Sequence, residues 1–195
     1  MKKFLAGFIV MSIIVLWSCS TVRYNKVYNY DDEFRGSSRE YVRLVLKPEE
    51  KRTEIGHARL IFERVEGTDG AYHEAYIVMM RAASSFGADR KAFLKAGEDK
   101  YELELKDPVS EYRTRTDETV STYISKDTSG VSVSTTTDID TRTWIEEKFI
   151  IKIPGESINA IMGSEELLFR FYFGPVPATY SIKGKKLGLI KVVIV

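Results

Sequence analysis

The two histidines are the first residues whose chemistry could build a metal site or supply a general base. The chain of 195 residues contains only His57 and His73. Residues 66–71 lie between them and predict a hairpin turn, because Gly, Asp and Thr supply turn geometry between two apolar runs. This register places His57 near Met80, about 24 Å along the ladder from His73 at about 3.4 Å per residue. We therefore expect both histidines at solvent-facing strand ends, too far apart to share a metal ion.

The acidic residues offer two further candidate sites. Asp138 and Asp140 have the spacing of paired carboxylates, but a calcium loop also needs a glycine turn and further oxygen ligands, and neither follows here. Their alternate spacing indicates a solvated strand face on which the two charges repel each other. Glu63, Glu66 and Glu74 match the acid pair of a glycosidase only by residue type. We expect no metal site and no acid–base pair.

Nucleophile and phosphate-binding motifs are also missing from the sequence. No Gly-x-Ser-x-Gly elbow surrounds Ser84, Ser85 or another serine, and there is no His-Glu-x-x-His motif. The run 184–186 (GKK) lacks the upstream glycines and the following Ser or Thr of a phosphate-binding loop. The sequence therefore predicts a protein that is not an enzyme, with no catalytic residues and no cofactor.

The first eighteen residues have the order of a secretion signal. Lys2 and Lys3 form a short basic region, and the uncharged apolar run 4–17 follows it. A membrane-spanning helix needs about 20 apolar residues to cross a hydrocarbon core of about 30 Å. The run is shorter than this, which favours a signal peptide, residues 1–18, over a permanent anchor.

The only cysteine of the chain, Cys19, stands directly after this segment. Leu16, Ser18 and Cys19 resemble the bacterial lipobox, in which a Leu three places before the cysteine and a small residue just before it direct lipidation of the thiol. The resemblance implies a lipoprotein carrying palmitate-type acyl chains on Cys19. Ser20 resembles the residue found in lipoproteins sorted to the outer membrane, and no acidic cluster follows at residues 20–26. We expect the periplasmic face of the outer membrane.

Charge argues against nucleic acid as a partner, and cysteine content excludes an internal disulfide. The formal charge is +1, and loss of Lys2 and Lys3 with the signal changes it to about −1 (+1 − 2). Nucleic acid is not an expected partner, because its binding depends on clustered Lys and Arg that neutralise phosphates. A single cysteine cannot form an internal disulfide.

The mature chain divides into a tether and one domain. Residues 19–39 are polar with no sustained period, which predicts a lipidated N-terminus and a flexible tether. Four aromatic residues in this stretch leave open that part of it docks on the domain as an extra strand: Tyr24, Tyr28, Tyr30 and Phe34. Residues 40–195 have the length of a single domain with its own core.

Alternation with period 2 dominates the domain. It marks residues 40–46, 57–65, 101–105 and 167–173 as half-buried strands, and turn residues separate them. A short helix is predicted near residues 156–162, where Ile158, Ile161 and Met162 have helical spacing before Gly163. The end, 185–195, carries both signals, and the β-branched run VVIV favours a strand. We expect an all-β, mainly antiparallel β-sandwich of about eight to ten strands, with a closed β-barrel as the alternative.

Residues 116–143 predict a projecting hairpin. Its arms are rich in Thr and Ser, which favour extended chain but offer little apolar surface to a core. The turn falls at Asp127, Thr128, Ser129 and Gly130, which form the candidate interaction surface.

These observations favour a lipid-anchored envelope protein that acts as a non-catalytic interaction or structural module. Its expected partners are the membrane, through the lipid, and an envelope protein or glycan. The alternative is a carrier or binder of a small apolar ligand or glycan, because an anchored barrel of this size is similar in outline to bacterial lipocalins. Their Gly-x-Trp motif on the first strand has no counterpart here, since Trp144 follows Arg142 and Thr143 late in the chain. An envelope hydrolase ranks third.

Overall fold

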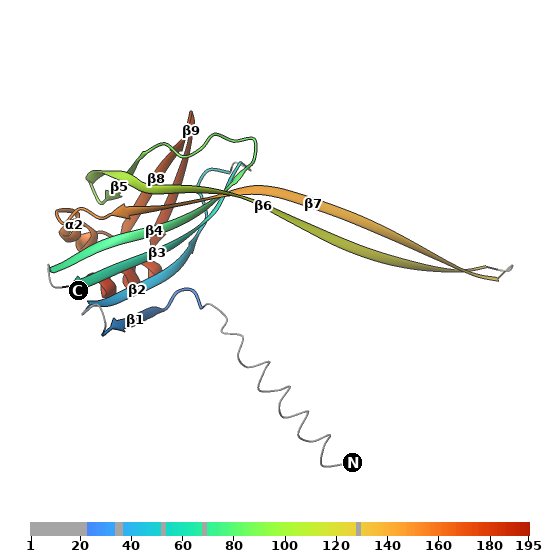
Figure 1. Ribbon diagram of the computed structural model, residues 1–195, viewed down its shortest axis with the longest axis horizontal. Helices are drawn as coiled ribbons and strands as arrows, with labels where there is room; N and C mark the ends of the chain where they lie inside the picture. The colour runs from blue at the N-terminus through green and yellow to red at the C-terminus, as the bar shows by residue number, and fades with distance from the viewer. Residues whose placement is uncertain (1–22, 34–36, 52–53, 68–69, 128–129) are drawn as a thin grey trace, which may run out of the picture.

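The computed structural model describes residues 23–33, 37–51, 54–67, 70–127 and 130–195 (Figure 1). These residues form one nine-stranded antiparallel sheet with two helices, in the strand order β1-β2-β3-β4-β7-β6-β5-β8-β9. The elements are β1 (Val27–Asp32), β2 (Ser37–Leu46), β3 (Ile55–Gly67), β4 (Gly70–Ala82), β5 (Lys91–Ala96), β6 (Asp99–Asp127), β7 (Gly130–Lys152), α2 (Ser157–Gly163), β8 (Glu166–Phe173), β9 (Val176–Lys183) and α3 (Lys185–Ile194). The predicted all-β antiparallel fold and the short helix are confirmed.

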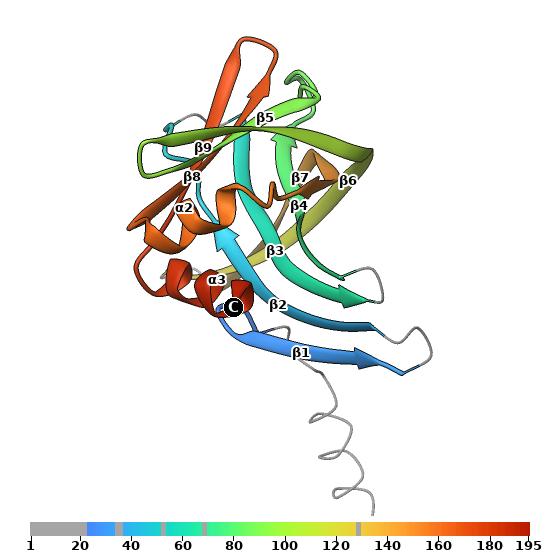
Figure 2. The same cartoon turned by 90° about the vertical axis from the view of Figure 1, so that its left-hand side faces the viewer.

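The sheet bends back on itself, so that β8 and β9 face β2 and β3 across one core (Figure 2). β6 joins the two halves, because its first residues pair with β5 and its later residues pair with β7. The change occurs between Glu104 and Leu105. A bulge follows between Lys106 and Val109, where Asp107 has φ +51° and Pro108 has no N–H to donate. β1 and β9 are the two edges of the sheet, so the arrangement is sandwich-like, and the closed barrel does not form.

The predicted hairpin turn at residues 66–71 is confirmed by the register of the strands. Gly67 pairs with Gly70 at the end of β3 and β4, and Gly70 has φ +106°, which favours glycine. Ala96 pairs with Asp99 around Gly97, which has φ +61°. The two turns place β3 beside β4 and β5 beside β6 with the alternation read from the sequence.

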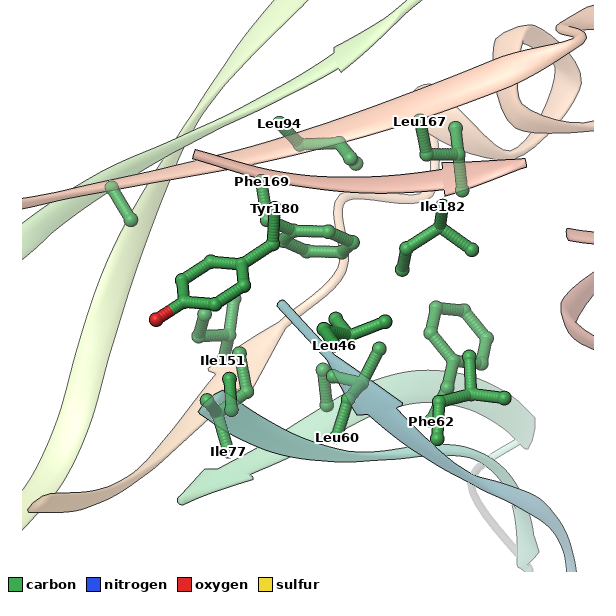
Figure 3. Close-up of a cluster of buried hydrophobic side chains, with 14 of the residues drawn as sticks. Leu46, Leu60, Phe62, Ile77, Leu94, Ile151, Leu167, Phe169, Tyr180 and Ile182 are labelled. Atoms are coloured by element: carbon green, nitrogen blue, oxygen red, sulfur yellow. The ribbon is translucent and has the colours of Figure 1, made fainter. Parts of the chain in front are cut away.

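The core is filled by the aromatic strand β8 and its neighbours. Leu167, Phe169, Phe171 and Phe173 are at most 2% exposed, and β8 lies one strand in from the edge, between β5 and β9. The ring of Phe171 lies 5.5 Å from that of Phe149 on β7, centroid to centroid. In Figure 3, side chains of this half point toward Leu46, Leu60 and others of the opposite half. The apolar face of β8 is therefore covered, and both of its edges are paired.

The C-terminal segment differs from the expectation. Residues 185–194 form the helix α3, and the prediction of a strand for 185–195 was wrong. Gly184, with φ +57°, turns the chain out of β9, and the helix then buries Leu187, Ile190, Val193 and Ile194. α3 packs against β2, β3 and β9 at the open side of the bent sheet (Figure 2). Burial of one helical face there outweighs the β-propensity of VVIV.

Part of the segment expected as a tether is a strand. β1 (Val27–Asp32) pairs with β2 along its whole length, and β2 itself begins at Ser37, before residue 40. Tyr28 stacks on Tyr41 with ring centroids 5.3 Å apart. The pairing of β1 with β2 and the stacking of Tyr28 therefore fasten this stretch to the domain. Cys19, residues 20–22 and Phe34 lie outside the described residues.

Candidate functional site

The long strands β6 and β7 leave the sheet together as a two-stranded ribbon (Figure 1). Residues 114–127 pair with residues 130–143, from Thr114 opposite Thr143 to Asp127 opposite Gly130. At about 3.3 Å per residue these 14 residues of each strand extend about 45 Å. Two of the candidate interaction residues, Asp127 and Gly130, form the last pair, and Thr128 and Ser129 lie outside the described residues.

The two faces of the ribbon differ in chemistry, because side chains alternate along each strand and cross-strand partners share a face. On one face Val120 is opposite Thr137, and Ile124 is opposite Val133. We call this face the apolar ribbon face; its uncharged members are Val120, Thr122, Ile124, Val131, Val133, Thr135, Thr137 and Ile139, and the exposed Glu118 lies at its base opposite Ile139. Its five Val and Ile side chains are 58–71% exposed. The sequence predicted the extended arms but not the gathering of these Val and Ile side chains on one face.

The opposite face of the ribbon carries most of the charged residues, including the aspartates considered as a cation site. Asp140 pairs with Arg142 at 2.7 Å, and Asp117 pairs with Arg115 at 2.7 Å. Asp138 is exposed and stands opposite Thr119. No cluster of three metal-ligating side chains occurs among the described residues. These aspartates form a solvated face on which Asp117 and Asp140 are neutralised by arginines.

The histidines do not meet, but only one of them is at the surface. His57 is exposed near the start of β3, whereas His73 is half-buried on β4, opposite Arg64. The ring of His73 lies 6.2 Å from that of Phe62, and burial lowers the pKa of His73 against the opposing effect of a hydrogen bond with the backbone of Ile194. The expectation of a solvent-side position was therefore wrong for His73, because α3 covers this end of the sheet.

Two of the three candidate glutamates face each other. Glu63 on β3 is directly opposite Glu74 on β4, and Arg39 lies 3.8 Å from Glu63. Burial raises the pKa of Glu63, Arg39 opposes this shift, and the charge of Glu74 adds to it. Glu66 instead pairs with Arg64 near the β3–β4 turn. Two of the three candidate glutamates, Glu63 and Glu66, are thus engaged in ion pairs with arginines.

A pocket on the outer face of the sheet gathers cations and tyrosines that are far apart in the sequence. Its volume is about 400 Å³, and it is lined by four cations and two tyrosines: Arg43, Arg59, Arg113, Lys148, Tyr24 and Tyr76. We call it the Arg43 pocket. Arg43 comes from β2, Arg59 from β3 and Lys148 from β7, each at an outward position of its strand. Sequence reasoning missed this site, because strand pairing alone brings these positions together.

Two glutamates pair with three of these cations. Glu146 accepts hydrogen bonds from Arg59 Nη2 at 2.9 Å and from Arg113 Nε at 3.4 Å. Glu111 accepts hydrogen bonds from Lys148 Nζ and from Arg113 Nη2, both at 2.5 Å. The hydrogen bond from Lys148 is the main cause of a lowered pKa of Glu111.

Arg43 differs from the other cations of the pocket. Its Cζ atom lies 5.3 Å from the ring centroid of Tyr41 and 5.7 Å from that of Tyr28. Among the described residues it has no ion pair, and its Nε is a buried donor without a hydrogen-bond partner. The tyrosine rings hold the guanidinium by cation–π attraction while its positive charge stays uncompensated.

No family model, curated protein or solved structure is significantly similar to this chain. Among the described residues, no helix has both the length and the apolar character that crossing a membrane requires.

Proposed function

We propose that this protein is a lipid-anchored bacterial envelope protein, held on the periplasmic face of the outer membrane, that acts as a non-catalytic interaction module. The observation that carries the proposal is the ribbon of β6 and β7, whose apolar face lies outside the domain (Figure 1). The lipobox-like residues Leu16, Ser18 and Cys19 supply the signal for lipidation and membrane attachment. The ribbon of β6 and β7 supplies the surface that contacts the partner, and we call it the interaction arm.

The partner we propose is another envelope protein. A two-stranded ribbon is only marginally stable alone in water, so burial of its apolar face against a second surface stabilises both. Insertion of the apolar ribbon face into lipid is unfavourable, because a single ribbon in hydrocarbon leaves the N–H and C=O groups of both edges unpaired. A protein surface can cover Val120, Ile124 and Val133 and also pair with an exposed edge.

The small area of the apolar ribbon face indicates a weak contact, which depends on both proteins being held in the same membrane. A face of about 45 Å by about 10 Å offers about 450 Å², about half of the roughly 800 Å² per partner of a standard interface. Anchoring both proteins in one membrane raises their effective concentration and supports such a contact. The lipid anchor and the ribbon would therefore act together in binding the partner.

Site-specific photo-cross-linking in intact cells tests the proposal. A photoreactive residue at position 124 places the probe on the apolar ribbon face, and the same residue at Ser125 is the matched control, because neighbouring side chains point to opposite faces. We expect one discrete protein adduct from position 124 and little from position 125.

Three outcomes would contradict this proposal. Equal adducts from both positions would show non-specific proximity, and adducts with lipid only would show that the arm lies on the membrane. An adduct of twice the mass of the chain would show that the partner is a second copy.

The packed interior supports an interaction module over a lipocalin-like carrier. The centre of the fold is filled by large side chains with less than 2% exposure, among them Phe62, Phe149 and Tyr180. Ligand binding remains a second candidate function because of the Arg43 pocket on the outer face.

A further inference from the structure

We propose that the Arg43 pocket binds the phosphate group of a phosphate monoester. The uncompensated guanidinium of Arg43 carries this inference, together with the three other cations around the same pocket. A cation held over tyrosine rings without a carboxylate partner is suited to a ligand that brings the negative charge. The arginines can present paired N–H donors to the oxygens of one phosphate group.

The charge of the pocket matches this ligand. Arg43, Arg59, Arg113 and Lys148 contribute +4, and Glu111 and Glu146 contribute −2, which leaves +2. A phosphate monoester carries about −1.5 to −2 at neutral pH. A monocarboxylate would leave part of this charge uncompensated, so the balance favours the phosphate.

The remaining walls of the pocket indicate that the ester has an apolar or flat organic part. Ile61, Tyr76 and Val78 line the pocket between the cations, and Tyr24 lines it from the segment before β1. A volume of about 400 Å³ is in the range of small-molecule sites. The phosphate would contact the cations while the organic part lies on these side chains.

The bound phosphate monoester could be a soluble compound or the headgroup of a lipid. Tyr24 follows Cys19 by five residues, which span at most about 18 Å of extended chain. If Cys19 is acylated, as the proposed function requires, the pocket lies within reach of the headgroup layer. The lipid source therefore rests on the proposed function, whereas binding of a phosphate monoester does not.

Calorimetric titration of the full chain in a neutral detergent tests the inference. The probes are glycerol 3-phosphate, as a soluble ester, and dioctanoyl phosphatidic acid, as a lipid with the same phosphate monoester. Glycerol is the uncharged control. We expect saturable binding of both esters and none of glycerol. Tighter binding of the lipid would identify a headgroup site, and equal binding would identify a site for soluble esters.

Matched variants separate the pocket from general surface charge. Arg43→Gln should weaken binding by about tenfold or more, because it removes a charged donor pair. Arg39→Gln removes the same charge from the same strand, but Arg39 pairs with Glu63 outside the pocket. The affinity of this variant for the ester should therefore differ from wild type by less than about twofold. Arg43→Lys keeps the charge but loses the planar guanidinium. Its affinity for the ester should lie between those of Arg43→Gln and Arg39→Gln.

The inference is overturned if neither ester shows saturable heat up to about 10 mM. It is also overturned if Arg39→Gln weakens binding as much as Arg43→Gln. Should Arg43→Gln fail to fold, Lys148→Gln must weaken binding by a similar factor. The Cys19→Ala chain should bind glycerol 3-phosphate with unchanged affinity, so a failure of the anchor and a failure of the pocket give different results.

Discussion

Arg81 donates a hydrogen bond from Nε to Oε1 of Glu147 at 2.8 Å, and the two side chains are only 9% and 7% exposed. The pair joins β4 to β7 where the ribbon leaves the sheet. Glu147 also accepts a hydrogen bond from the backbone N–H of Ala88 at 2.9 Å, and Arg81 donates from Nη1 to the carbonyl oxygen of Ser85 at 2.7 Å. The base of the ribbon is thus fixed to the loop before β5.

We expect Glu147→Ala to lower the free energy of unfolding by about 3–5 kcal/mol, because it leaves the buried Arg81 guanidinium without its carboxylate. Urea denaturation followed by circular dichroism measures the loss. The double variant Arg81→Met/Glu147→Leu should be closer to wild type, since it removes both charges. A double variant less stable than Glu147→Ala would contradict this account.

Phe171→Ala should lower the free energy of unfolding by about 3–5 kcal/mol, because Phe171 packs between Phe149 and Tyr180 in the core. Thr135→Ala on the exposed ribbon should stay within about 1 kcal/mol of wild type. Thermal and urea unfolding of the two variants side by side is the measurement. Similar losses in both would show that the ribbon contributes to the core stability.

Stability should fall below neutral pH through His73. Burial holds the pKa of His73 below its ordinary value, so the folded protein keeps the imidazole neutral. As the pH falls through the unfolded-state value of about 6.5, the unfolded chain takes up a proton that folded His73 resists, and the free energy of unfolding decreases. The urea midpoint should therefore drop less in His73→Gln than in wild type between about pH 7.5 and about pH 5.5. An equal drop would assign the effect to other groups.

Cys19→Ala should abolish lipid labelling and release the protein from the membrane fraction. One acyl chain gives only marginal binding, at about 0.8 kcal/mol per buried CH₂, so a stable anchor requires the several chains of a mature lipoprotein. Metabolic labelling with an acyl precursor and fractionation of envelopes measure both effects. Retention of label and membrane association in the variant would exclude lipidation at this residue.

Elements with a local signal could be predicted from the sequence alone. The period-2 runs of β3, β6 and β8 and the glycines of their turns specify strands and hairpins through neighbouring residues only. The same holds for α2, where helical spacing of Ile158 and Ile161 precedes Gly163. These features need no information about distant parts of the chain.

The tertiary structure decided what depends on distant partners. Residues 185–194 are helical because the open side of the bent sheet buries one helical face, although VVIV by itself favours a strand. His73 is half-buried for the same reason. Arg43, Arg59 and Lys148 meet only because β2, β3, β4 and β7 are neighbours in the sheet. Pairing and burial are long-range interactions, which local periodicity does not encode.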